Sequence, residues 1–500
     1  MVPVSFYSDN IYFLKKSKQM TGEKIPGDLD TWDYFGTDPN AILVWSYAIL
    51  SQRATTLYHT HPPVTSAINK LTNYAIGSGL RFRSQPDWEI LGWSKDKAKN
   101  WGMQFQKLVH YVFLLLNFYQ KQGILFRTGL IMGDSLLLFD RNKNKNNNLF
   151  DIIETGGDQI DWKCTGEKCT LGIWHDEYLR REAVQLFGKD KKIEFQDGET
   201  GDQNVIQFYD KLIARQLRGY PLAYRIISAA KNNDRWWDAT LARLVMETII
   251  FAQVSETNAG DTQRVIDTIA DTLYANQEID QKEGTIKREN IANGTPGAII
   301  SRTEKGKGIE YTELKTPSNN FDKVENAYID MVGMATDVPP ECVLSRFNTS
   351  YTAHKGAFND FQKSYILKRN NFAHNAADVV LYEVAKYIFL EGMIEMPKNF
   401  FENPIIRLAA LKGNWLGPVP GHINPVQEVD ALIKAKDNAF VTPADATLNY
   451  SMNEWDDQIE EWQQQMAEWR KIPQEKQAEI IGNEMQSNED TYQQPVEVQQ

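Results

Sequence analysis

The sequence predicts an α+β fold that is mainly helical, and three features of the chain lead to this prediction. Long segments carry apolar residues at the three- and four-residue spacing of amphipathic helices. The block from Thr128 to Tyr209 instead consists of short strand-like runs separated by turns. A chain of 500 residues with 42% hydrophobic residues can bury a substantial core and form more than one domain.

The part of the chain up to Tyr209 combines helices with these strands. Apolar periodicity marks the helices, and polar or Gly-Gly runs mark the turns. In order, we expect an arm over 1–36, helical structure over Trp45–Ile76 interrupted at Pro62-Pro63, a helix over Trp101–Gln122, a strand over 128–140, a polar turn over 142–148 and a strand over 151–162 that turns at Gly156-Gly157.

Two cysteines in this block could suggest a metal site. Cys164 and Cys169 lie near His175, but no fourth ligand stands at a usual spacing. The alternation WKCTGEKCTLGIW is typical of a β-hairpin, so we predict a hairpin and no metal. Together with Cys342, these cysteines supply no disulfide framework and fit a reducing compartment.

Two long helical patterns follow. Pro221 can open the first helix, where its missing N–H costs nothing, and the pattern reaches about Val254, on the order of 50 Å. Trp236 and Trp237 cannot both face the same way, so one of them is expected to meet a neighbouring element or subunit. A long core helix is equally consistent with the periodicity. The second helix is expected over Asn319–Thr336.

The segment 257–316 between these helices is too long for a linker and predicts a small domain. After the second helix, Pro339-Pro340 and the run Asn348–Ser350 predict an exposed loop before a further helix. One amphipathic face precedes the loop and another follows it: Phe321, Val324, Tyr328, Met331 and Ala335, then Phe358, Phe361, Tyr365 and Phe372.

The last patterned segment, 453–470, predicts a helix with a heptad seam. Its seam residues are spaced four, three, four and three apart: Trp455, Ile459, Trp462, Met466 and Trp469. Such a seam needs a partner helix, which packing around a ring axis would supply. The alternative is a solitary amphipathic helix docked on its own core. Beyond Pro473 the polar composition predicts disorder.

The net charge of −12 is concentrated at one end of the chain. Residues 451–500 contain twelve acidic and three basic residues, so the remaining 450 residues carry only −3. Tight DNA binding needs a Lys and Arg footprint, because phosphate neutralisation supplies much of the affinity. The charge distribution therefore argues against a sequence-specific DNA binder and permits a conduit through which DNA slides.

No motif for catalysis or for a cofactor is recognisable. The chain lacks a Gly-x-x-x-x-Gly-Lys-Ser/Thr loop, Gly77-Ser78-Gly79 lacks the third glycine of a dinucleotide site, and no Ser-His-Asp or Cys-His set is suggested by spacing. We therefore predict a protein that is not an enzyme and uses no cofactor or metal. Without a signal-peptide pattern or an apolar run of membrane-spanning length, we expect it to be made in a cytoplasm and to have no membrane partner.

Four short blocks occur in order between Leu57 and Trp469. They comprise Pro63, Ala67, Ile68, Gly77, Gly79 and Leu80; Arg218, Gly219, Pro221, Asp238 and Ala239; Leu344, Ser345, Arg346, Ser350, Tyr351 and Thr352; and Trp415, Gly417, Gly421, Ile423, Pro425 and Glu428. In these residues the chain resembles the lambda-like portal proteins of tailed bacteriophages, and the order of the blocks supports the resemblance more than any single block does.

The resemblance implies a ring, usually a dodecamer, at the capsid portal vertex of the virion, assembled in the host bacterial cytoplasm. Double-stranded DNA would pass through its channel during packaging and ejection, without sequence specificity. The implied protein partners are the terminase large subunit, the head–tail connector or adaptor protein, and the major capsid and scaffolding proteins. The implied domains are an N-terminal arm (1–36), the N-terminal part of a wing (37–217), stem helix 1 (218–256), a clip (257–316), stem helix 2 (317–338), the tunnel loop, tunnel helix and C-terminal part of the wing (339–430), crown-like helices (431–472) and an acidic disordered tail (473–500).

The resemblance also implies roles for particular residues. A tunnel loop facing the DNA would contain Arg346, Phe347, Asn348, Thr349, Ser350, Tyr351 and Lys355. Stem and subunit packing would involve Arg218, Gly219, Pro221, Trp236 and Trp237, and the heptad seam would belong to the crown. The alternatives for the loop are that Arg346 forms a helix-cap ion pair and that Tyr351 is ordinary core. For the whole chain, the alternatives are a nuclease or protease associated with phage assembly, or a monomeric scaffold without DNA contact.

Overall fold

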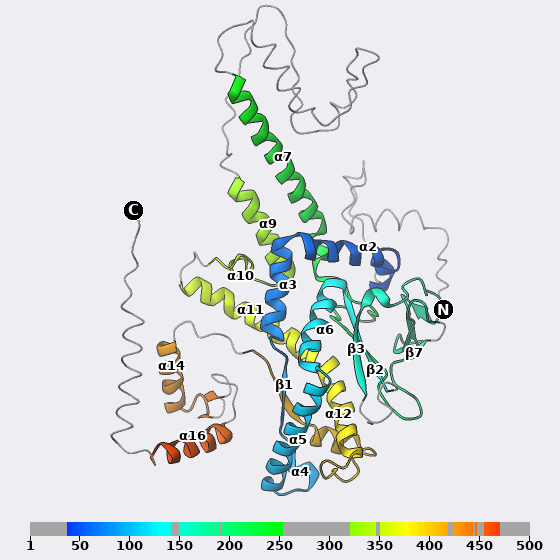
Figure 1. Ribbon diagram of the computed structural model, residues 1–500, viewed down its shortest axis with the longest axis vertical. Coiled ribbons are helices and arrows are strands. Elements are labelled where there is room, and N and C mark those ends of the chain that lie inside the picture. The colour runs from blue at the N-terminus through cyan, green and yellow to red at the C-terminus, as the bar shows by residue number, and fades with distance from the viewer. Residues whose placement is uncertain are drawn as a thin grey trace, which may run out of the picture. The chain divides into compact units, whose positions relative to one another are not determined.

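The computed structural model of the protein describes residues 38–141, 150–189, 192–253, 321–346, 351–418, 425–443, 446–447 and 455–470 (Figure 1). The chain divides into two compact units, Met1–Trp415 and Leu416–Gln500, which are described separately. The expected arm, clip and acidic tail, the polar turn over 142–148 and most of the tunnel loop lie outside the described residues. Within these residues, helices combine with three small sheets, in agreement with the predicted α+β class.

Two helices joined at a sharp break begin the described part of unit 1. α2 (Pro39–Thr60) follows Asp38, whose carboxylate accepts a hydrogen bond from a first-turn backbone N–H at 3.0 Å. α3 (Pro62–Ala75) follows His61, which is extended (φ −113°, ψ 99°) as the residue before a proline prefers to be. The predicted interruption at Pro62-Pro63 is confirmed.

The next helical part differs from the prediction. After the short α4 (Trp88–Leu91), the chain forms α5 (Lys95–Leu115) and α6 (Phe118–Met132) instead of one helix and a strand. Asn117 adopts a left-handed conformation (φ 52°) that separates α5 from α6. The strand expected from residue 128 was wrong for residues 128–132, because a short apolar run fits a buried helix as well as a strand.

A three-stranded antiparallel sheet forms the centre of the β-rich part. β2 (Asp134–Asp140) lies between β3 (Asp151–Gly156) and β8 (Val205–Tyr209), and α6 packs against this sheet. Leu136 and Leu137 are both fully buried, but they belong to different hydrophobic clusters because successive strand residues face opposite ways. The central strand is therefore covered on both faces.

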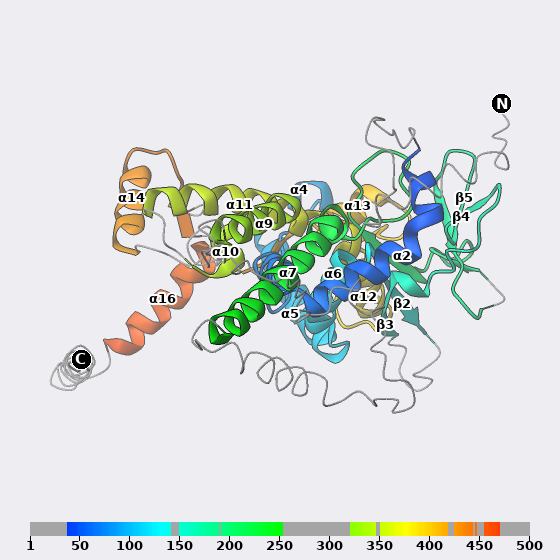
Figure 2. The same cartoon turned by 90° about the horizontal axis from the view of Figure 1, so that it is seen from above.

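A second sheet consists of four short strands in chain order. Its members are β4 (Cys169–Thr170), β5 (Ile173–His175), β6 (Arg181–Val184) and β7 (Ile193–Glu194). Cys169 pairs with Trp174, which confirms the predicted hairpin, and its tight turn falls at Leu171-Gly172. Figure 2 shows this sheet at the opposite end of unit 1 from α11 (Tyr351–Phe372).

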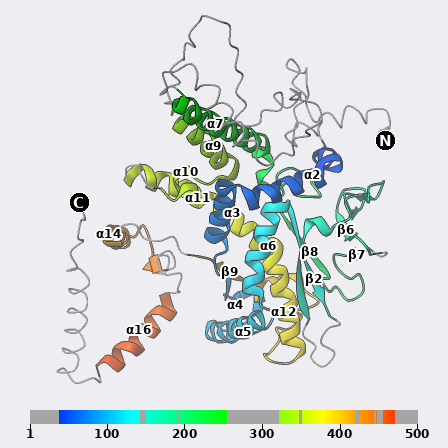
Figure 3. The same ribbon diagram turned by 45° about the horizontal axis from the view of Figure 1, so that its top comes forward.

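Two long helices lie side by side and project from the rest of unit 1 (Figures 1 and 3). They are α7 (Ile227–Gln253) and α9 (Phe321–Thr336), and the 27 residues of α7 span about 40 Å. The second helix agrees with the prediction. The first starts later than predicted, because Leu222–Ile226 forms a 3₁₀ turn after Pro221 before the α-helix begins.

The remainder of unit 1 returns to the core through α11 and the elements after it. α11 continues through a π-helical turn into α12 (Asp378–Leu390), and α13 (Pro404–Ala410) follows. β9 (Gly413–Leu416) then pairs with β1 (Arg81–Ser84), so strands from near both ends of this unit form a two-stranded sheet. Long-range pairing of this kind closes the core.

The second unit contains two described helices, α14 (Pro425–Asp437) and α16 (Trp455–Trp469). α16 confirms the helix predicted over the heptad seam. Three seam side chains are partly exposed: Trp455 at 39%, Trp462 at 56% and Met466 at 36%.

A buried ion pair ties the sheets of unit 1 to the approach of α7. Arg218 and Asp134 are both fully buried, and the Arg218 Nε lies 2.5 Å from Asp134 Oδ2. The other guanidinium nitrogens donate to the carbonyl oxygens of Leu171 at 2.9 Å and Gly157 at 2.8 Å. The Arg218 side chain lies over the ring of Tyr47 on α2, with 4.0 Å between the guanidinium carbon and the ring centroid. Every face of this cation thus meets a different segment.

The electrostatics of the pair agree with its geometry. Burial alone lowers the pKa of Arg218, but the Asp134 carboxylate and Tyr47 oppose this effect, and the net pKa is raised. Asp134 uses its other oxygen to accept hydrogen bonds from Gln207 Nε2 at 3.0 Å and from the Gly219 backbone N–H at 2.9 Å. Both charges are therefore paired and hydrogen-bonded, as buried charges must be.

Gly219 is required at its position by a close approach of two backbone segments. A Cβ atom there would lie 2.0 Å from the carbonyl oxygen of Gly133. Gly133 has φ +93° and would meet Gly219 in the same way, with 2.5 Å between its Cβ and the Gly219 oxygen. The Arg-Gly pair of the sequence block therefore serves the interior of a single subunit.

Replacing Arg218 with Met should lower the free energy of unfolding by about 3–5 kcal/mol, because Asp134 would remain buried without its counter-charge. The matched control is Arg225→Met, which removes an exposed arginine seven residues away and should cost about 0.5 kcal/mol or less. Urea unfolding followed by circular dichroism measures both. Equal effects of the two variants would contradict a structural role for the buried pair.

Candidate functional site

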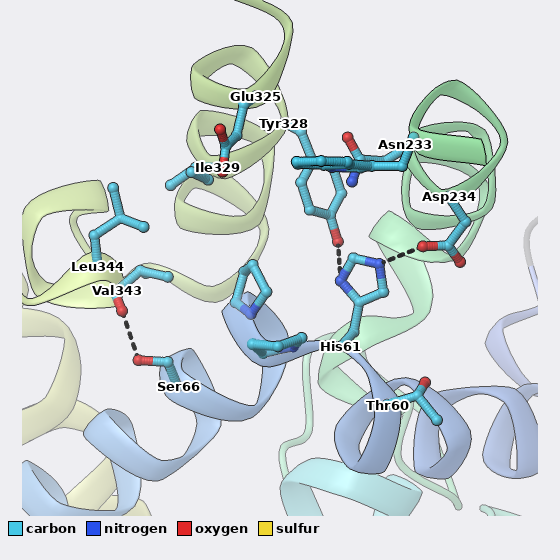
Figure 4. A pocket seen from close by; sticks show the side chains of 13 residues that line it. Thr60, His61, Ser66, Asn233, Asp234, Glu325, Tyr328, Ile329, Val343 and Leu344 are labelled. Carbon is cyan, nitrogen blue, oxygen red and sulfur yellow. Dashed lines mark hydrogen bonds and ion pairs between the residues drawn. The ribbon is translucent and has the colours of Figure 1, made fainter. Parts of the chain in front are cut away.

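Three helical segments meet where the projecting helices join the rest of unit 1, and His61 lies between them. The residue is 7% exposed. Nε2 lies 3.0 Å from Asp234 Oδ1 on α7, and Nδ1 lies 2.9 Å from the hydroxyl of Tyr328 on α9 (Figure 4). One side chain from the α2–α3 junction thus holds both long helices.

The proton positions in this cluster follow from the environment of Tyr328. Burial raises the pKa of the Tyr328 phenol and the Asp234 carboxylate raises it further, so the phenol stays protonated. Its O–H can therefore donate to Nδ1 of His61, which leaves the Nε2–H to donate to Asp234. The Asp234 side chain is 61% exposed, so solvent screens its attraction and the Tyr328 contact is the better protected one.

A cavity of about 500 Å³ lies beside this cluster (Figure 4). Its walls come from the α2–α3 junction, α7, α9 and α10 (Pro340–Leu344): Thr60, His61, Pro62, Pro63, Ser66, Asn233, Asp234, Trp237, Glu325, Tyr328, Ile329, Val343 and Leu344. The Ser66 hydroxyl donates to the Val343 carbonyl oxygen at 2.6 Å, so it braces α10 rather than meeting His61. The contacts of His61 and Ser66 are those of a structural joint.

The two helices that flank the predicted tunnel loop both contact α3. Before the loop, Ser66 on α3 holds Val343, and the chain leaves α10 at Ser345 in a left-handed conformation (φ 53°). After the loop, Arg369 on α11 donates to the last carbonyl oxygens of α3, at 2.7 Å for Ala75. The helix before the loop and the helix after it are therefore both held against α3, the second through the C-terminal half of α11.

Aromatic rings, one pair edge to face and one pair stacked, strengthen the contact between α11 and α3. Tyr74 on α3 packs against Phe361 with ring centroids 5.3 Å apart and against Tyr365 with centroids 5.6 Å apart. Phe361 and Tyr365, two residues of the predicted amphipathic face, are at most 2% exposed. Such aromatic pairs add to the stability that their buried area provides.

The described part of the predicted tunnel loop is small. Arg346 is exposed and Lys355 is half-buried near the start of α11. Tyr351 is the first residue of α11, and the predictions for Phe347–Ser350 lie outside the described residues. The assignment of this loop to a DNA channel stays a prediction.

The predicted stem residues fall into two groups. Arg218, Gly219 and Pro221 lie within their own chain, where Arg218 has no exposed surface left for a neighbouring subunit. Trp236 and Trp237 are half-buried on α7 and pack edge to face with ring centroids 5.8 Å apart. Trp237 also lines the cavity, so it meets α9 side chains of the same chain across that space.

The apolar face predicted for α9 is divided by the structure. Tyr328 and Ala335 are at most 9% exposed, whereas Val324 is 37% exposed and Met331 is 48% exposed. Met334, which does not belong to the predicted face, is 73% exposed. Val324, Ala327, Met331 and Met334 are spaced three, four and three residues apart, and we name them the α9 stripe. Periodicity located the apolar surface but not the part that faces the core.

The described residues contain no cluster of His, Cys, Asp and Glu side chains that could hold a metal ion. In the same part of the chain, no helix combines the length and apolarity needed to span a membrane.

Paired long helices thus project from a base of helices and sheets, and the contacts of His61 join the helices to that base. Residues 26–369 match the family of phage portal proteins, lambda family. The chain therefore belongs to the lambda family of phage portal proteins, which is a structural family associated with the capsid of the virion. No protein with a curated description matches the chain.

Replacing Tyr328 with Phe should lower the free energy of unfolding by about 1–3 kcal/mol, because Nδ1 of buried His61 would lose its donor. Thermal and urea unfolding measure the change. The control is Tyr111→Phe. Tyr111 is 64% exposed, so the loss of its hydroxyl leaves no buried group without a hydrogen-bond partner. A Tyr328 variant as stable as this control would show that the His61 contact does not hold α9 to the base.

Proposed function

We propose that this chain assembles into a closed ring whose channel conducts double-stranded DNA into the capsid during packaging and out of it during ejection. The observation that carries the proposal is the α9 stripe. Val324, Met331 and Met334 form an apolar strip on a helix that already buries another face in its own subunit. A strip with heptad-like spacing on an exposed helix needs a partner helix, and copies of the same chain can supply it.

The geometry of the projecting helices favours a ring over a two-fold dimer. α7 and α9 lie side by side, so a subunit presents different helices to its two sides. Contact between the α9 stripe of one subunit and a different surface of the next is heterologous, and heterologous contacts close into rings or continue into filaments. Membership of the portal family favours the closed ring, and we propose the dodecamer usual in such rings.

The His61 cluster at the base of the long helices would hold these helices in place while DNA moves through the channel. His61 ties both helices to α3, and α3 also contacts the helices on either side of the loop that begins at Arg346. We propose that this loop faces the channel, where Arg346 and Lys355 make weak contacts with passing phosphates. Outside residues 451–500 the net charge is only −3, which agrees with a path that DNA traverses without tight binding.

The partners follow from this function. The segment 257–316 connects the far ends of α7 and α9, and we propose that it docks the terminase large subunit during packaging and the head–tail connector afterwards. Capsid and scaffolding proteins would surround the ring at its vertex. The partly exposed seam of α16 supports a further contact between copies in the crown. The structural nature of the family favours this account over the alternative of a nuclease or protease.

The double substitution Met331→Glu and Met334→Glu should convert the ring to free subunits of 57.4 kDa, because neighbouring chains would have to bury charges in the contact. Light scattering measures the mass. Both methionines are exposed in the single chain, so the fold should be unaffected. Asn326→Glu, which adds a charge to an exposed position of α9 outside the stripe, is the control and should leave the ring intact.

Replacing residues 346–352 with a short Gly-Ser linker should preserve the mass of the ring and reduce the DNA that particles package or retain. Assembly is spared because the flanking helices are fixed to α3. The same linker in place of the exposed turn 198–200 serves as the control. Normal packaging with the loop removed would mean that the loop does not line the channel.

A further inference from the structure

Two cysteine side chains meet in the loop that leads into β4. The backbone N–H of Gly172 donates to the Cys164 carbonyl oxygen at 3.0 Å, and the Cys169 thiol donates to that same oxygen at 3.1 Å. The N–H of Gly166 donates to the Cys169 carbonyl oxygen at 2.6 Å, which closes the turn between the two cysteines. The backbone therefore already holds both residues at the neck of one short turn.

The two thiols differ in access to solvent. Cys169 is 4% exposed, whereas Cys164 is half-buried and the four residues 165–168 between them are exposed. Burial raises the pKa of the Cys169 thiol, and a hydrogen bond between the two thiols raises it further. Cys164 is therefore the thiol that a reagent in solution reaches first.

We propose that Cys164 and Cys169 are a reversible disulfide-forming pair, which a small-molecule disulfide oxidises once the virion has left the reducing cytoplasm. Both residues are free thiols in the present structure. They are five residues apart in the sequence, and the Cys169 thiol already reaches the Cys164 carbonyl oxygen within their shared turn. Thiols persist in cytoplasm and disulfides persist outside it, so the change of compartment supplies the driving force.

The reaction balances as two successive thiol–disulfide exchanges. Cys164 loses its proton to solvent, and its thiolate attacks one sulfur of glutathione disulfide, which forms a mixed disulfide and releases one glutathione thiolate. Cys169 then loses its proton and attacks the Cys164 sulfur, which breaks the mixed disulfide and releases the second glutathione thiolate. Each released thiolate takes up one proton. Two electrons pass from the cysteine pair to glutathione disulfide.

The new bond would close the turn at residues 165–168 and fix the start of β4. β4 is the edge strand of the four-stranded sheet, and its ladder to β5 contains only the pairs Cys169–Trp174 and Thr170–Ile173. A covalent closure at Cys169 would therefore restrain opening of this edge. Cys342 takes no part, because it is buried in α10, which packs on α3 and α9.

The experiment treats the folded full-length protein with glutathione disulfide, alkylates the remaining thiols and maps the peptides by mass spectrometry. Of the three cysteines, only Cys342 should remain alkylatable, and one peptide pair should carry a Cys164–Cys169 bond that dithiothreitol reverses. Cys342→Ser is the control and should form the same disulfide. Persistence of both thiols, or of glutathione adducts without ring closure, would overturn the proposal.

Two single variants separate the steps. Cys169→Ser should accumulate a stable glutathione adduct on Cys164, because the resolving thiol is gone. Cys164→Ser should leave Cys169 unreacted, since Cys169 is buried. An equally rapid adduct on Cys169 in the second variant would contradict the assigned order of attack. Faster amide exchange at residues 165–170 in the reduced protein than in the oxidised protein would confirm the restraint on β4.

Discussion

The buried contact between Arg218 and Asp134 is the constraint on which the rest of unit 1 depends. Arg218 reaches four segments at once: β2 through Asp134, the turn at Gly157, the hairpin at Leu171 and the ring of Tyr47 on α2. A charge without exposed surface is tolerated only if all its hydrogen-bonding groups are satisfied. The pair therefore specifies one arrangement of these segments, and that arrangement sets where the chain turns toward α7.

The mechanical properties of the proposed portal follow from this arrangement. The chain leaves the Arg218 contact, makes a 3₁₀ turn and enters α7, whose Asp234 meets His61 at the α2–α3 junction. Tyr328 on α9 meets the same imidazole, and α3 continues from that junction to contact the helices on either side of the loop. The long helices and the helices that flank the loop are therefore all held by α3 or by His61, the residue before it. Force applied to the loop by moving DNA would pass into α3 and the aromatic core.

Local signals predicted much of this fold, and contacts distant in sequence account for what they missed. Pro62-Pro63 predicts the break between α2 and α3, because a proline restricts the conformation of the residue before it. The seam spacing alone predicts the helix α16. Residues 128–132 did not reveal their helix, because a short apolar run has no period of its own. The partner of Arg218 lies 84 residues away, and the exposure of Met331 depends on which side of α9 meets the core. Neither property is present in a local pattern.

Ring formation by this single chain is the central claim, and the mass and shape of the purified protein test it most directly. Light scattering combined with negative-stain imaging should show a closed particle with a central hole and a mass that is a large whole-number multiple of 57.4 kDa. A species that remains a single 57.4 kDa subunit, both alone and when co-expressed with its capsid and scaffolding proteins, would contradict the account. In that case the α9 stripe would need an occupant other than a second copy of the chain.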